Sequence, residues 1–147
     1  MTSEQRKISR PALPPNEITK FFWDAAREHK LVLQRCDGCG YYIHWPGVIC
    51  PRCGSDHLSP AQMSGKGTIF TYTVVHHVFH PIYAGDIPYS IAIVELDEQP
   101  GLRMLANIVD CPNDALYIGM PVEVTFQDLE TITLPQFHPA PEAKARP

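Results

Sequence analysis

Two C-x-x-C pairs constrain the fold of this chain more than any other sequence feature. They are Cys36-Asp-Gly-Cys39 and Cys50-Pro-Arg-Cys53, with ten residues between them. Glycines inside or directly after each pair allow the positive backbone dihedrals that point amide groups at thiolate sulfurs. Four thiolates at this spacing can close a tetrahedron around Zn²⁺. The sequence therefore predicts a structural zinc ribbon whose ligands are Cys36, Cys39, Cys50 and Cys53.

Other chemistry is open to the same cysteines. A redox dithiol is disfavoured because the C-x-x-C motif occurs twice and outside a βαβ context, but an iron–sulfur or rubredoxin-type iron site needs the same four ligands. With all coordination positions filled by protein, the metal has no open site for substrate and acts as a staple for the fold. Cys111, beside Pro112, is predicted to be an ordinary small residue; the alternative is a nucleophile.

Composition excludes several classes of protein. The chain has 147 residues, and its 12 Lys and Arg against 16 Asp and Glu give a net charge of −4. This length suits one domain, or one with a small appendage, and requires no disulfides. The acidic balance argues against a generic nucleic-acid binder but leaves room for a small anionic ligand held by a few donors. Without an apolar span or a secretory signal, we expect a soluble, cytoplasmic protein with no membrane association.

The N-terminal part divides into an arm and a helix. Residues 1–15 have no hydrophobic period and are expected to form a flexible arm, either disordered or lying on another surface. Within 16–32, an apolar stripe recurs at helical spacing, with Asn16 as the expected N-cap. The stripe consists of Ile18, Phe21, Phe22, Ala25 and Ala26, with Trp23 on its flank. Such a helix either covers the core or docks on a partner subunit.

The remaining chain is predicted to be β-structure. After the ribbon, assigned to 33–62, apolar residues alternate with polar ones in short runs separated by turn residues. The expected strands are 67–79, 89–97, 102–109, 121–128 and 130–135. Five short strands indicate a small closed barrel or a sandwich, assigned to 63–138. A flexible tail is expected over 139–147.

The sequence offers no catalytic constellation, because the nucleophile-elbow, phosphate-loop and dinucleotide motifs are all missing. On an extended segment, His76 and His80 would lie roughly 13 Å apart, too far to share a metal, and His77 would face the other way. We therefore expect them to line a groove or to be solvated. Phe70 and Tyr72 would share one strand face, from which they could stack on bases.

The order of these features resembles that of the DUF35 family. The resemblance covers about residues 16–140, and it is specific because a ribbon is followed by two characteristic strands. The segments that carry it are Phe21-Phe22-Trp23, 33–40 (LQRCDGCG), 50–54 (CPRCG), 65–76 (GKGTIFTYTVVH), 93–97 (IVELD), 119–124 (GMPVEV) and 134–137 (LPQF). It implies a mainly β protein with an N-terminal helix, a rubredoxin-like zinc ribbon and a five-stranded OB-fold barrel.

The resemblance also implies a function. Family members are partner subunits without catalytic residues of their own, so we expect a hetero-oligomer with a thiolase-like enzyme that cleaves or forms C–C bonds in acyl-CoA thioesters, as in steroid side-chain or aromatic catabolism, or transfers acyl groups. Alternatives are an accessory subunit of a hot-dog-fold hydratase, a single-stranded nucleic-acid binder, and a self-sufficient acyl-CoA enzyme using His76 or His77.

The predicted contact residues fall into two groups. Aromatic side chains are enriched among interface anchors, although packing against the helix would also account for them. The candidates for partner contact are Phe21, Phe22, Trp23, Tyr41, Tyr42 and Trp45. The candidates for contact with acyl-CoA, mainly with its phosphates, are Arg35, Arg52, Lys66, His76 and Arg103.

Overall fold

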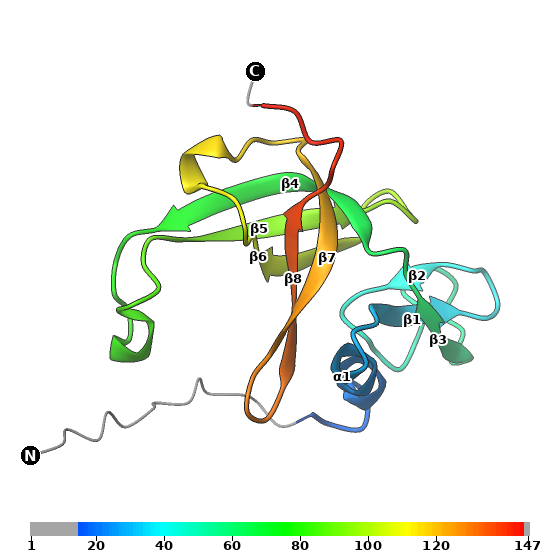
Figure 1. Cartoon of the computed structure of the whole chain (residues 1–147). Coiled ribbons are helices and arrows are strands. Elements are labelled where there is room, and N and C mark those ends of the chain that lie inside the picture. Colours follow the sequence, from blue (N-terminus) through cyan, green and yellow to red (C-terminus); the bar gives the residue numbers. More distant parts are fainter. Residues whose placement is uncertain (1–14, 146–147) are drawn as a thin grey trace, which may run out of the picture.

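The computed structural model describes residues 15–145, which form one helix and two antiparallel sheets (Figure 1). The expected arm over 1–15 lies outside the described residues, apart from its last residue. Within the described part, no helix is both long and apolar enough to cross a bilayer. The predicted fold class is confirmed: a mainly β chain with an N-terminal helix, a ribbon and a nearly closed five-stranded barrel.

The helix α1 spans Lys20–Arg27, which is shorter than the expected stretch. Asn16 opens the turn that precedes it, because its side-chain Oδ1 accepts hydrogen bonds from the amides of Ile18 and Thr19 at 3.1 and 2.9 Å. The apolar stripe buries Phe22 and Ala26, whereas Ile18 remains 42% exposed. One face of the helix therefore packs on the core, as its hydrophobic period indicates.

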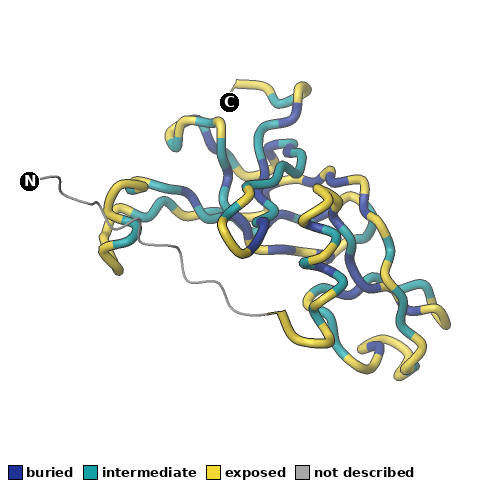
Figure 2. Tube along the Cα trace, turned by 60° about the horizontal axis from the view of Figure 1, so that its bottom comes forward, coloured by how far each residue is buried: buried dark blue, intermediate teal, exposed yellow. Residues whose placement is uncertain are grey.

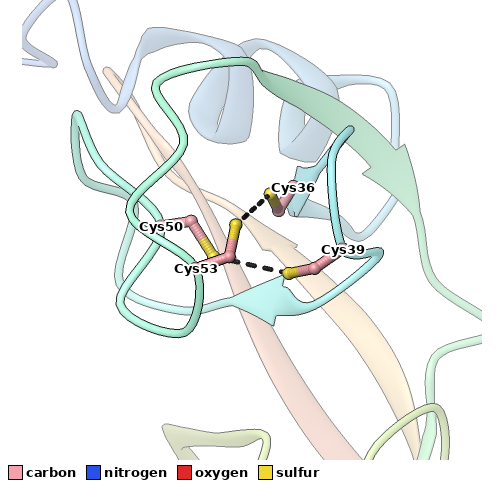
Figure 3. Close-up of side chains that lie close together, drawn as sticks. All are labelled: Cys36, Cys39, Cys50 and Cys53. Atoms are coloured by element: carbon pink, nitrogen blue, oxygen red, sulfur yellow. Dashed lines mark hydrogen bonds between the residues drawn. The ribbon is translucent and has the colours of Figure 1, made fainter.

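The ribbon contains three strands, β1 (Val32–Cys36), β2 (Tyr42–Ile43) and β3 (Leu58–Gln62). They form an antiparallel sheet in the order β2-β1-β3. The first C-x-x-C pair turns the chain from β1 into β2, and the second pair lies in the connection from β2 to β3. This arrangement brings the two cysteine knuckles to the same end of the small sheet (Figure 3).

Five strands form the barrel in the order β6-β5-β4-β7-β8. A parallel bridge between Ile108 and Phe137, with the amide of Val109 donating to the Phe137 carbonyl at 2.8 Å, brings the outer strands together. Short 3-10 helices, η1 (Pro81–Tyr83) and η2 (Asn113–Ala115), interrupt two of the loops. The strands are β4 (Lys66–Val75), β5 (Tyr89–Leu96), β6 (Arg103–Asn107), β7 (Pro121–Asp128) and β8 (Thr133–Pro139).

The observed strands differ from the expected ones mainly at their ends. β4 stops at Val75, where it pairs with the first residue of β5, so residues 76–88 form a long loop that projects from the barrel (Figure 1). β8 begins three residues later than the expected strand and extends to Pro139. The next residue, Ala140, is buried and donates its amide to the Pro121 carbonyl at 2.9 Å. The first residues of the expected tail therefore belong to the sheet.

Helix, ribbon and barrel share one hydrophobic core. Phe22 from α1, together with Leu31 and Leu33 from the following segment, packs with the inward side chains of the barrel. A second, smaller cluster surrounds Cys36 and Cys50 in the ribbon. Buried segments gather in the middle of the molecule, whereas projecting loops are exposed (Figure 2). The packing of α1 and β1 on the barrel fixes the position of the ribbon.

Candidate metal centre and docking surface

The four predicted ligands converge in one cluster (Figure 3). The Sγ atoms of Cys36 and Cys53 are 3.6 Å apart, those of Cys39 and Cys50 are 3.7 Å apart, and all four lie within 4.8 Å of one another. Thiolates placed at about 2.3 Å from a tetrahedral metal would lie roughly 3.8 Å apart, whereas a disulfide would need about 2 Å. The donor set and spacing therefore fit a closed four-cysteine metal site.

The two knuckles are built alike. The Gly40 amide donates to the Cys36 carbonyl and the Gly54 amide donates to the Cys50 carbonyl, each at 2.9 Å. Both glycines have positive φ, 76° and 77°, a backbone conformation that side chains disfavour. Each knuckle contributes one buried cysteine, Cys36 or Cys50, and one exposed cysteine. The site is thus anchored in the small ribbon core and reaches the surface.

The pKa values of the clustered thiols differ from one another. The backbone amide of Cys39 lowers the pKa of Cys36 to about 6. The Ser55 amide lowers the pKa of Cys53, but the adjacent thiols of Cys36 and Cys39 outweigh it and raise this pKa to about 12. Crowded sulfurs cannot all ionise together unless a cation compensates their charge. A divalent metal supplies that charge and would make thiolates of all four.

Cys111 lies apart from this cluster. Its Sγ contacts the carbonyl of Pro112 at 3.5 Å, and burial, followed by the charge of Asp114, raises the pKa of its thiol. A thiol with a raised pKa is a poor nucleophile. This environment favours the prediction that Cys111 is an ordinary small residue.

An aromatic cluster joins α1 to the loop between the knuckles. The ring of Phe22 contacts those of Trp23 and Trp45 edge to face, each with centroids 4.9 Å apart. His44 packs on Trp45 at 4.6 Å. Burial lowers the pKa of His44 to about 4, and its Nδ1 atom is buried without a hydrogen-bond partner. This imidazole is therefore neutral at pH 7 and acts as part of the apolar packing.

Beyond these rings, the same loop exposes an apolar surface. Trp45, Val48 and Ile49 are 51%, 66% and 57% exposed; we call these three residues the ribbon patch. The loop is held in place because the side chain of Gln34 both donates to and accepts from the backbone of Gly47, at 2.9 and 3.0 Å. Val48 and Ile49 were not among the predicted contact residues. The sequence did hold one indication of their exposure. Val48 and Ile49 are adjacent apolar residues just before Cys50, in a loop that shows no alternation of apolar and polar residues.

The six aromatic residues predicted for partner contact separate into different environments. Phe22 is only 3% exposed and belongs to the core, the alternative that the sequence left open for this helix. Phe21, Trp23 and Tyr42 are half-buried and pack against that same core. Tyr41 packs on the small ribbon core. Of the six, only Trp45 is largely exposed.

Two of the predicted CoA contacts lie in the ribbon. The guanidinium of Arg35 lies 5.4 Å from the ring centre of Tyr42, and its Nε donates to the Gly40 carbonyl at 3.3 Å. The guanidinium of Arg52 lies 5.9 Å from the ring centre of Tyr41. These cations thus already contact aromatic rings of the protein.

The other three predicted contacts belong to the barrel. Arg103 lies 3.7 Å above the ring centre of Phe70 and donates from Nε to Glu95 at 2.9 Å. Lys66 begins β4, and His76 follows its last residue. Because the ten residues of β4 span roughly 33 Å, Lys66 and His76 cannot meet one phosphate group. The five basic residues predicted to contact acyl-CoA therefore do not form one common site.

The proposed base-stacking pair is also separated. A register shift between Ile69 and Thr71 interrupts the alternation of β4. Phe70 is 44% exposed beneath Arg103, whereas the Tyr72 side chain packs against the core and its hydroxyl donates to the Leu116 carbonyl at 3.0 Å. Residues two apart on a regular strand point to the same face, but a bulge between them turns them to different faces. The two rings do not form one stacking platform.

His76, His77 and His80 lie in the loop between β4 and β5. The predicted strand 67–79 would instead have placed His76 and His77 on a strand. The ring of His77 contacts that of Phe79 at 4.8 Å, and His80 Nδ1 accepts from the amide of Ile82 at 3.2 Å. Within residues 15–145, the four ribbon cysteines are the group of potential ligands close enough to hold a metal. No shared site of His76 and His80 is found there.

The fold and the cysteine site define a class of protein that joins a zinc ribbon to an OB-fold. Two family models match the chain: the rubredoxin-like zinc ribbon domain of ChsH2 over residues 23–59, and the C-terminal OB-fold domain of ChsH2 over residues 61–127. A DUF35 domain-containing scaffold protein of Methanocaldococcus jannaschii is 40% identical over 101 residues, covering 68% of this chain and 70% of the relative. The chain belongs to the DUF35 family.

Two further similarities concern enzyme complexes. A probable enoyl-CoA hydratase alpha subunit of Thermomonospora curvata is 38% identical over 140 residues, or 95% of this chain. The chain spans 43% of the length of that relative. Among solved structures, the Ltp2-ChsH2(DUF35) aldolase matches with a TM-score of 0.77 and 40% identity, covering 88% of this chain and 98% of that chain.

Proposed function

We propose that this chain is a non-catalytic partner subunit that assembles with a thiolase-like enzyme acting on an acyl-CoA thioester. The observation that carries the proposal is the ribbon patch. Three exposed apolar side chains, Trp45, Val48 and Ile49, lie within one five-residue stretch of a loop braced by Gln34. An exposed apolar patch next to a rigid scaffold is typical of a protein contact surface.

The similarity to the Ltp2-ChsH2(DUF35) aldolase supports an aldolase of this kind as the partner, with C–C bond cleavage or formation as the reaction. The Thermomonospora curvata relative favours a second candidate, an acyl-CoA hydratase subunit. In both cases the partner supplies the catalytic residues. This chain would stabilise the partner and help to enclose the thioester.

We infer that the metal of the ribbon is zinc and that its role is structural. Four cysteine ligands leave no coordination position for water or substrate. The metal would hold together a ribbon whose own core is small, comprising Cys36, Ile43 and Cys50 with two half-buried neighbours. A stable ribbon is needed to present the ribbon patch in a fixed geometry.

Co-expression with thiolase-like and hydratase proteins of the same organism tests the assembly. We expect a stoichiometric complex on size exclusion, and no thioester turnover by the chain alone. Ile49→Asp should weaken the complex at least about tenfold, because a carboxylate would be buried in an apolar contact. Ile118→Asp is the matched control, since Ile118 is 68% exposed and lies outside the ribbon patch.

Two results would contradict the proposal. One is a chain that stays monomeric beside every such partner. The other is an Ile49→Asp variant that binds as tightly as the Ile118→Asp variant, which would exclude the ribbon patch as the contact surface.

A further inference from the structure

A cleft of about 630 Å³ lies on the barrel, away from the cysteine site. It is formed by the beginning of β5, the end of β6, the 76–88 loop and the loop that follows β6, with Gln127 of β7 and Gln136 of β8 completing the lining. Its volume falls within the range of small-molecule sites, roughly 300–1,000 Å³. No residue of the ribbon or of α1 lines it.

The lining is apolar and aromatic over much of its extent. The rings of Tyr83 and Tyr89 lie with their centroids 6.3 Å apart and their planes tilted by 46°. Ile91, Leu105 and Val109 add aliphatic surface, and Leu105 is 67% exposed. A large aliphatic side chain left this exposed at the edge of a cleft is available to cover an apolar ligand.

The walls of the cleft are tied together within the protein. Asn113 donates from Nδ2 to the Pro88 carbonyl at 3.0 Å, which joins the loop after β6 to the 76–88 loop. Asn107 donates from Nδ2 to the Ser90 carbonyl at 2.9 Å, which joins β6 to β5. A cleft braced in this way is preformed, so a ligand need not order it.

The polar groups of the lining select against phosphate. Among residues 15–145, its charged side chains are Asp86 and Asp110, both acidic, and no Lys, Arg or His of that range lines the cleft. The amide side chains of Asn107, Asn113 and Gln136 supply neutral hydrogen-bonding groups, since an amide has two donors and an acceptor and one internal bond leaves capacity for others. The five basic residues predicted to contact CoA all lie elsewhere.

We propose that this cleft binds an uncharged, mainly apolar small molecule that carries hydroxyl or carbonyl groups. The apolar side chains cover its body, and the amide side chains meet its polar groups. We expect the cleft to disfavour the nucleotide half of coenzyme A, because its phosphates would lie near two acidic side chains, Asp86 and Asp110. The proposal does not depend on which enzyme the chain joins.

Binding of Nile red, an uncharged apolar dye with a carbonyl group, tests the proposal on the full chain. The dye should bind with blue-shifted emission, and NMR amide shifts should map to residues 86–91 and 105–113. Leu105→Asp should weaken binding at least about tenfold, whereas Ile118→Asp, at a site 68% exposed and outside the lining, should not. Coenzyme A should not displace the dye.

The mapping on the unmodified chain keeps the proposal testable even if a variant fails to fold. Shifts confined to the ribbon patch, equal binding by the Leu105→Asp and Ile118→Asp variants, or displacement of the dye by coenzyme A would each overturn it.

Discussion

Gln99 and Tyr42 are joined by two hydrogen bonds across the boundary between barrel and ribbon. The Tyr42 amide donates to Gln99 Oε1 at 2.9 Å, and Gln99 Nε2 donates to the Tyr42 carbonyl at 3.1 Å. Gln99 lies in the turn between β5 and β6, and Tyr42 is the first residue of β2. The side-chain amide of Gln99 thus binds the backbone of β2 much as a neighbouring strand would. Because β2 immediately precedes the loop of the ribbon patch, this pair helps to fix the patch relative to the barrel.

Replacing Gln99 should loosen that junction. In Gln99→Ala, the amide and carbonyl of Tyr42 lose their partners in a half-buried place, and we expect the free energy of unfolding to fall by about 1–3 kcal/mol. Urea denaturation measures this loss. Gln62→Ala is the matched control, because Gln62 is exposed on β3 and should change stability by less than about 0.5 kcal/mol. Equal effects of the two variants would show that the pair does not stabilise the junction.

The close approach of β4 to β5 gives a second prediction. A Cβ atom on Gly67 would lie 2.5 Å from the Glu95 carbonyl oxygen and 2.8 Å from Val94 Cγ1. The Gly67→Ala variant must therefore push strands apart, and we expect it to lose about 1–3 kcal/mol of stability by thermal or urea unfolding. A Cβ on Gly85 would meet nothing within 4 Å, so Gly85→Ala should unfold like the natural chain.

Metal content follows from the cysteine geometry. Elemental analysis of the purified chain should find about one zinc ion per chain. Cys36→Ser should lose the metal and the protection of ribbon amides from hydrogen exchange, because binding of a structural zinc is coupled to folding. Cys111→Ser should retain both. A ribbon that is folded without metal, or a content of about one iron ion per chain in place of zinc, would refute the prediction of a structural zinc ion.

The neutral, buried His44 gives a pH dependence. Its folded-state pKa of about 4 lies below the ordinary 6.5, so between these values the unfolded chain binds more protons. Stability should therefore fall as the pH decreases from about 6.5 to about 4, by at most about 3.5 kcal/mol at roughly 1.4 kcal/mol per pH unit.

Urea titrations at several pH values measure this effect. His44→Phe, which keeps a ring beside Phe22 and Trp45, should flatten the dependence relative to the natural chain. His57→Gln should leave the dependence unchanged, because the His57 side chain is 82% exposed. An unaltered slope in His44→Phe would assign the pH dependence to other groups.

Local pattern was sufficient for much of this protein. The C-x-x-C pairs identify the four cysteines by spacing, because each knuckle is a short local structure, and the pairing of β1 with β2 and β3 brings the two knuckles together. Alternation also describes 102–109, where the every-second residues Leu102, Met104, Ala106 and Ile108 are all buried. In both cases the local sequence identifies the residues. The tertiary structure added the distances between them.

Contacts between distant segments decided the rest. Phe22 and Trp45 have similar character in the sequence, yet packing of α1 on the barrel buries the first and leaves the second at the surface. The bulge in β4 separates Phe70 from Tyr72 because β4 must pair with β5 in a shifted register. The cleft beside Leu105 exists only where two loops meet β5 and β6. Residue type and spacing thus identified the four clustered cysteines, whereas exposure and shared surfaces depend on which segments cover one another.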